Sequence, residues 1–205
     1  MTAEEFKTHV NRQSDADMIG LCLREDQTPY VFESDPPKWD SFREFLSTKL
    51  AVAQADIRVV GSARLGFSMK PGKNLKSFSD TSDIDVVIVN TRLFDALWLS
   101  LLRAAYPRPP ATNTNRLGGW LESRRNELYT GWLTPLEIRL DLKIYGPKAR
   151  PIVDFNSRWF NTMKLASQIP PRRHEDITSR LYRSWDHAEL YHLHSLGELR
   201  KSLTE

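Results

Sequence analysis

Two carboxylates open an apolar run near the middle of the chain, and this feature most restricts how the chain can fold. Residues 82–89 read Ser-Asp-Ile-Asp-Val-Val-Ile-Val, which predicts a buried strand over 83–89. Asp83 and Asp85 are two residues apart, so they point to the same face of that strand. A pair of hard oxygen ligands on a rigid element suits Mg²⁺.

A Gly-Ser pair lies upstream, after the short apolar stretch 57–60. We expect a strand over 57–60, a turn at Gly61-Ser62 and one helical turn over 62–66. The backbone N–H groups and the Ser62 hydroxyl of such a turn can bind a phosphate. Arg64 has two interpretations, a phosphate ligand or a surface arginine. A metal site beside a phosphate site indicates nucleotide chemistry.

A third carboxylate is usual in a two-metal site. Residues 136–145 alternate strictly between apolar and polar, which predicts a half-buried strand. Asp141 lies in the middle of its polar face and is the best candidate; Glu137 is the second choice and Asp154 the third. The alternative for Asp141 is an exposed strand residue paired with a basic neighbour.

These motifs resemble those of the DNA polymerase β-type nucleotidyltransferase superfamily, whose signature is Gly-Ser, a spacer and then Asp-x-Asp. The match is strong over 57–89 and plausible over 136–145. The resemblance implies an α+β fold, a small mixed β-sheet with flanking helices and additional C-terminal helices. Small stand-alone members of this superfamily often serve in prokaryotic antiviral defence or toxin–antitoxin systems, so the resemblance implies such a role here. A partner protein encoded nearby is a further expectation.

The family's functional residues can be carried over to this chain. Asp83, Asp85 and Asp141 would bind two Mg²⁺ ions, or Mn²⁺ in their place, and form the catalytic site. Ser62, with Gly61, would contact the triphosphate. On the C-terminal helical part, Tyr182 could stack on a base and Arg183 could pair with phosphate.

The spacer between Ser62 and Asp83 is longer than the family's usual one. The excess is the segment 69–76, which carries Lys70, Lys73 and Lys76. It has three interpretations: a lid over the triphosphate, with Lys73 as a nucleotide ligand, a surface for a nucleic-acid backbone, or a disordered, solvated insertion.

The remaining pattern is mostly helical. We expect helices within 2–33 and over 38–54, 90–105 and 154–167, and a long helix or helix pair over 174–203. In this division, residues 1–150 form the catalytic core with a helical N-terminal segment, and residues 151–205 form a C-terminal helical region packed on it.

Net charge, cysteine count and apolar runs bear on whether the protein binds nucleic acid, zinc or a membrane. The net charge of +3 permits a nucleic-acid partner without requiring one. The single cysteine, Cys22, excludes a multi-cysteine zinc site and fits a reducing cytoplasm. No apolar run approaches the roughly 20 residues of a membrane span, so no membrane partner is expected.

The leading hypothesis is therefore an Mg²⁺-dependent nucleotidyltransferase. It would move an NMP or dNMP from ATP or another nucleoside triphosphate to an acceptor hydroxyl on a nucleic acid, an oligonucleotide, a protein or a small molecule. The alternative is a catalytically inactive binding module or antitoxin with the same fold. A weaker third hypothesis is a general RNA-binding protein.

Overall fold

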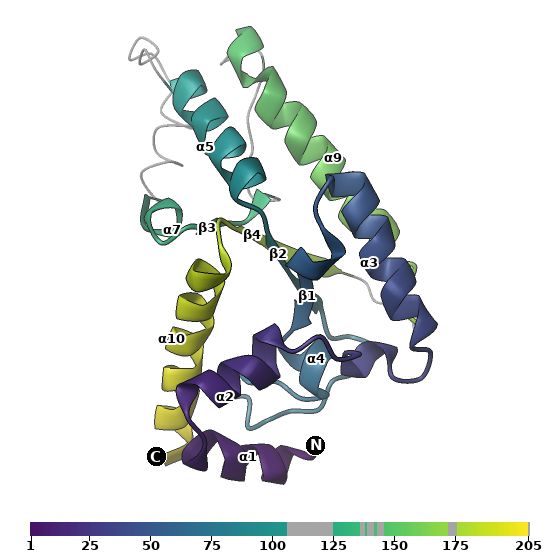
Figure 1. Ribbon diagram of the computed structural model, residues 1–205, viewed down its shortest axis with the longest axis vertical. Coiled ribbons are helices and arrows are strands. Elements are labelled where there is room, and N and C mark those ends of the chain that lie inside the picture. The colour runs from purple at the N-terminus through teal and green to yellow at the C-terminus, as the bar shows by residue number, and fades with distance from the viewer. Residues whose placement is uncertain (106–124, 136–137, 139–141, 143–145, 172–175, 205) are drawn as a thin grey trace.

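The computed structural model describes residues 1–105, 125–135, 138, 142, 146–171 and 176–204. In these ranges the chain forms eight α-helices and one four-stranded mixed sheet, with strand order β1-β2-β4-β3 (Figure 1). The predicted α+β class, with a small mixed sheet and flanking helices, is confirmed at this level.

The sheet is built around β2 (Ile84–Val89). On one side β2 pairs antiparallel with β1 (Ile57–Val60), and on the other it pairs parallel with β4 (Ile177–Tyr182). A short β3 (Trp132–Leu133) adds antiparallel to β4. Because β2 lies between two strands, its start is the point where residues from β1 and β4 meet.

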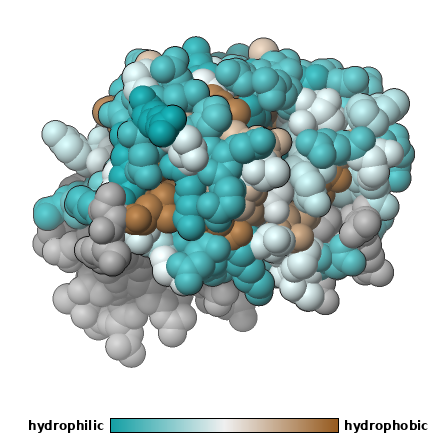
Figure 2. Space-filling view, turned by 90° about the horizontal axis from the view of Figure 1, so that it is seen from below, coloured by the Kyte–Doolittle hydropathy of each residue, from teal (hydrophilic) through white to brown (hydrophobic). Residues whose placement is uncertain are grey.

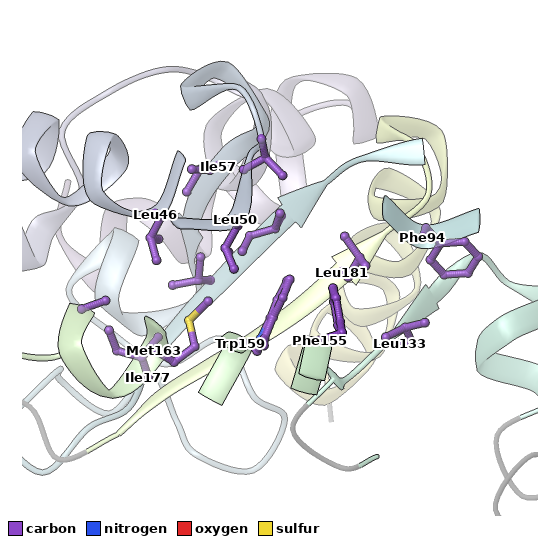
Figure 3. Close-up of a cluster of buried hydrophobic side chains, with 14 of the residues drawn as sticks. Leu46, Leu50, Ile57, Phe94, Leu133, Phe155, Trp159, Met163, Ile177 and Leu181 are labelled. Carbon is purple, nitrogen blue, oxygen red and sulfur yellow. The ribbon is translucent and has the colours of Figure 1, made fainter. Parts of the chain in front are cut away.

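One face of the sheet holds the main hydrophobic core. It is covered by α3 (Pro37–Leu50), α5 (Thr91–Ala105) and α9 (Arg150–Ala166) (Figures 1 and 3). Trp159 of α9 is fully buried there, and its indole N–H donates to the Ser179 hydroxyl of β4 at 2.8 Å. Figure 3 shows side chains of the helices and strands converging in this layer.

The opposite face is covered by α10 (Trp185–Thr204), α2 (Asp15–Ile19) and the π-helical turn η1 (Gly20–Arg24). The far end of α10 contacts α1 (Ala3–Arg12), where Arg200 donates to the Val10 carbonyl at 2.9 Å. The short α4 (Ser62–Leu65) follows β1, and α7 (Arg125–Tyr129) precedes β3. Single turns η2 (Tyr30–Phe32), η3 (Gln54–Asp56) and η5 (Gly146–Ala149) complete the described elements.

Most local predictions are confirmed. The strand at 57–60 and the helical turn after Gly61 form as expected, and the strand expected over 83–89 begins one residue later, at Ile84. Ser14 caps α2 by accepting from the Asp17 N–H at 3.2 Å. The helix expected over 38–54 ends earlier, at Leu50, because Ala51 takes a left-handed conformation with φ of 56°.

The helix predicted over 174–203 is wrong in its first part. Residues 177–182 form β4, and the helix begins only at Trp185. Within β4, buried Ile177, Ser179 and Leu181 alternate with residues of the other face, which is the period of a strand. The range 151–205 therefore contributes a strand to the sheet as well as helices. The strand predicted over 136–145, with Asp141 and Glu137, lies outside the described residues except for Ile138, which is buried, and Leu142.

Candidate functional site

The end of β1 and the start of β2 bring the Gly-Ser turn against the carboxylates. Val60 is the register partner of Asp85, so Gly61 follows directly beside it. Gly61 has φ of +65°, and a Cβ there would lie 3.3 Å from Oδ2 of Asp85. A larger residue would be strained in this conformation and would crowd the carboxylate. The glycine is therefore a requirement of the close approach.

Asp85 is held from the other side by β4. Thr178 is its register partner, and the Thr178 hydroxyl donates a hydrogen bond to Oδ1 of Asp85. Asp83 lies just before β2 and is exposed. Both carboxylates therefore stand at one end of the sheet, and Asp85 is fixed between two neighbouring strands.

A cleft of about 550 Å³ opens over these carboxylates. Its sheet side includes Asp83, Asp85 and Arg180, and Gly61 and Ser62 also line it. One wall is the middle of α10, and the other is the loop that follows α4. The wall residues are Tyr191, His192, His194, Ser195 and Glu198 on α10, and Ser68, Met69, Lys70, Pro71, Lys73, Lys76, Ser77, Thr81 and Ser82 on the loop.

The lysine-rich loop is an ordered hairpin. Phe67 and Ser77 form a β-bridge, and the Ser68 N–H donates to the Lys76 carbonyl at 2.8 Å. Phe67 and Leu75 are buried in a cluster with residues of α1, α2 and α10. We call residues 67–77 the lysine hairpin. Its anchoring favours the lid or the nucleic-acid surface over the solvated, disordered insertion.

The hairpin gives the cleft a cationic wall. Lys70, Lys73 and Lys76 all line the cleft and are exposed. Among the residues that the structure describes, no carboxylate forms an ion pair with any of the three. The end of the molecule where α1 and the C-terminus lie is mostly hydrophilic, with small hydrophobic patches (Figure 2). Three ammonium groups beside two carboxylates suit an anionic ligand bound with a metal.

A second cationic group stands on the sheet side of the cleft. The Arg180 guanidinium packs against two neighbouring rings, 5.5 Å from the Trp132 centroid and 5.0 Å from the Tyr191 centroid. Next to it, burial and the Arg180 charge lower the pKa of His192 from 6.5 to about 4. His192 is therefore neutral at physiological pH.

Three predicted ligands lie away from the cleft lining. Arg64 is buried and donates to the Leu21 carbonyl at 2.6 Å and the Glu25 carbonyl at 2.9 Å, so it joins α4 to the η1 region. Tyr182 is fully buried against Tyr191, at 5.9 Å between ring centroids. Burial raises the pKa of the Tyr182 phenol.

Arg183 is at the opposite end of β4 from Thr178. It pairs with Asp95 of α5, with Nε 2.9 Å from Oδ1. The structure thus brings Gly61, Ser62, Lys73, Asp83 and Asp85 together, and it places Arg64, Tyr182 and Arg183 in structural contacts.

The third carboxylate, Asp141, lies outside the described residues. Asp154 is exposed on α9, the helix that covers the other face of the sheet. Within the described ranges no three His, Cys, Asp or Glu side chains gather as a metal site. The sequence reasoning missed Thr178 and His192 as cleft-region residues, and the alternation of residues 177–182 was the signal that could have revealed Thr178.

Comparisons with protein-family models, with curated proteins and with solved structures found no match to this chain. Among the described helices, none combines the length and the apolar character needed to cross a membrane.

Proposed function

We propose that the protein is a metal-dependent nucleotidyltransferase that moves a nucleoside monophosphate from a nucleoside triphosphate to an acceptor hydroxyl. One observation carries the proposal: a single cleft contains Asp83, Asp85, the Gly61-Ser62 turn and the three lysines Lys70, Lys73 and Lys76. Carboxylates for metal and cations for phosphate are the parts that this chemistry requires.

The carboxylates fit a divalent cation such as Mg²⁺. Both are exposed or half-exposed at the start of one strand, and both line the cleft. Hard oxygen ligands of this kind typically share a Mg²⁺ ion with water and substrate phosphates. The bound metal would lower the cost of charge on the transferring phosphoryl group.

The chain's own residues position the reactants. The Thr178 hydroxyl and Gly61 fix Asp85, so one metal ligand is held before substrate arrives. The Ser62 hydroxyl would donate to a phosphate oxygen, and the lysines would balance the charge of the triphosphate. Preorganised groups of this kind supply most of the catalysis in phosphoryl transfer.

The reaction balances without a further co-reactant. The acceptor oxygen forms a bond to the α-phosphorus, and the bond from that phosphorus to the oxygen bridging to the β-phosphate breaks. Pyrophosphate leaves with the bonding electrons, and the hydroxyl proton passes to a carboxylate and then to solvent. Asp141, in the role that the family resemblance implies, is the proposed carboxylate.

The test measures pyrophosphate release and the transfer of labelled nucleotide to an acceptor. The protein is incubated with Mg²⁺ and each α-³²P-labelled NTP and dNTP, alone and with RNA, DNA or protein. We expect pyrophosphate release and label on an acceptor, and neither product with Asp83→Asn. If wild type and Asp83→Asn give the same background in every mixture, the proposal fails.

A nucleotide-binding module without chemistry would give a different result. It would bind an NTP in equilibrium dialysis with Mg²⁺ and release no pyrophosphate. Binding and turnover measured on the same preparation therefore separate the two functions.

A further inference from the structure

The two walls of the cleft differ in chemistry. The lysine hairpin presents Lys70, Lys73 and Lys76, whereas the facing part of α10 presents the rings of Tyr191 and His194. A cationic wall opposite planar rings is the arrangement that binds single-stranded nucleic acid, because phosphates follow the cations and bases stack on the rings.

The hairpin is built to hold its lysines in place. Hydrogen bonds from the Lys73 N–H to the Lys70 carbonyl, at 3.1 Å, and from the Lys76 N–H to the Lys73 carbonyl, at 2.9 Å, form two successive turns. Asn74 and Leu75 have positive φ, 45° and 51°, which non-glycine residues seldom adopt. The buried Leu75 side chain maintains this shape. The backbone that carries the three lysines is thereby held in a defined shape on one wall of the cleft.

The facing wall is also fixed. Tyr191 contacts Trp132, with ring centroids 5.2 Å apart, and lies against the Arg180 guanidinium. His194 is exposed on the same helix and lines the same cleft. Arg180 has no carboxylate partner among the described residues, so a cation also stands at the foot of this wall.

We infer that the acceptor is a single-stranded nucleic acid, which lies in the cleft with its backbone along the lysine hairpin and its bases toward Tyr191 and His194. That the bound strand accepts the nucleotide rests on the proposed function, whereas its binding in the cleft does not. Three cations on one wall of the cleft fit a chain of phosphates, and the rings on the α10 wall give the bases a place to stack. A protein acceptor has no need of this pairing.

The experiment measures binding apart from catalysis. Asp83→Asn protein is titrated into labelled single-stranded RNA and DNA oligonucleotides of mixed sequence, without NTP, at several salt concentrations. The test variant replaces Lys70, Lys73 and Lys76 with Gln. The matched control replaces Lys38, Lys49 and Lys164, on α3 and α9, with Gln, so both variants lose the same charge.

We expect the hairpin variant to raise Kd at least about 10-fold and to reduce the slope of log Kd against log salt by about 2, since each phosphate contact on a single strand contributes about 0.7. The control variant should change Kd less than about 3-fold, because its lysines lie outside the cleft. His194→Ala should weaken binding several-fold without changing the salt slope, because it removes a ring and not a phosphate contact. Melting curves check that both triple variants fold.

Three outcomes overturn the inference. In the first, the hairpin and control variants weaken oligonucleotide binding equally. In the second, the hairpin variant of the active protein raises KM for NTP and leaves oligonucleotide binding unchanged. In the third, label from the NTP goes to protein, and the hairpin variant transfers it normally. Failure of the proposed function looks different, because the wild type would then bind oligonucleotide and release no pyrophosphate.

Discussion

The two faces of the central strand β2 differ where the strand begins, although Val87 and Val89 farther along the second face are buried as well. Ile84, Val86 and Ile88 pack into the layer under α3 and α9, where they are almost fully buried. On the other face the strand begins with Asp85, which is half-exposed at the edge of the cleft. One strand therefore supports stability on one face and holds polar groups for ligands at the start of the other. Substitutions on the two faces should separate stability from activity.

The largest effect is expected from Trp159→Ala on the core face. Trp159 is fully buried, and its removal leaves a cavity and deprives the Ser179 hydroxyl of its indole partner. We expect the free energy of unfolding in urea to fall by roughly 3–5 kcal/mol. The control is the next residue, Phe160, which is 56% exposed. Phe160→Ala should change this free energy by no more than about 0.5 kcal/mol. Equal losses for the two variants would contradict the assignment of this face to stability.

On the cleft face, Asp85→Asn should have the reverse effect. The neutral amide keeps the shape of the side chain but is a poorer metal ligand, so kcat for pyrophosphate release should fall at least about 100-fold. The free energy of unfolding should stay within about 1 kcal/mol of the wild type, because Asp85 is not in the core. Asp154→Asn, an exposed acid on α9, is the control and should leave kcat unchanged. Normal turnover by Asp85→Asn would remove the proposed role of this carboxylate.

The local elements could be predicted because their signals are local. The apolar run after Asp85 and the Gly61-Ser62 pair are each readable in a few residues, and the structure places the Gly-Ser turn and the start of the apolar strand at the same end of the sheet. The strand pairing that positions them also determines which other residues reach the cleft. Thr178 reaches Asp85 only because β4 pairs with β2 in this register.

The errors arose where tertiary pairing decides the structure. Residues 177–182 precede a long amphipathic helix, and their apolar positions were assigned to that helix's pattern. As part of β4, Tyr182 becomes a core residue, and Arg183 lies at the far end of the strand beside Asp95. Arg64 satisfies two backbone carbonyls from the N-terminal segment, a contact between residues about 40 positions apart in the chain. No local pattern contains that information.

His192 makes the cleft face sensitive to pH, in contrast to the apolar core face. Its pKa is lowered by burial, and by Arg180 of β4, from 6.5 to about 4. Between these values the unfolded chain binds the proton and the native protein does not, so stability is complete above about pH 6.5 and falls as the pH drops toward 4. We expect His192 to account for about 1–3 kcal/mol of this loss.

Urea unfolding between about pH 7.5 and about pH 4.5 measures this dependence. His192→Gln should reduce the dependence of the unfolding free energy on pH. His194→Gln, on the exposed part of the same helix, should leave that dependence as in the wild type. A wild-type slope that persists in His192→Gln would show that another group is responsible.

The smallest effect tests how the cleft face holds its carboxylate. Thr178→Val keeps the shape of the side chain and removes the hydroxyl that donates to Oδ1 of Asp85. Because Asp85 keeps its place on β2 but loses the donor that orients it, kcat should fall about 10-fold, with KM for NTP nearly unchanged. Thr178 is exposed, so the free energy of unfolding should move by less than about 1 kcal/mol. Thr178→Ser retains the hydroxyl and should recover most of the activity. If Thr178→Ser and Thr178→Val lower kcat by the same factor, the hydrogen bond to Asp85 does not determine kcat, and Thr178 has no positioning role.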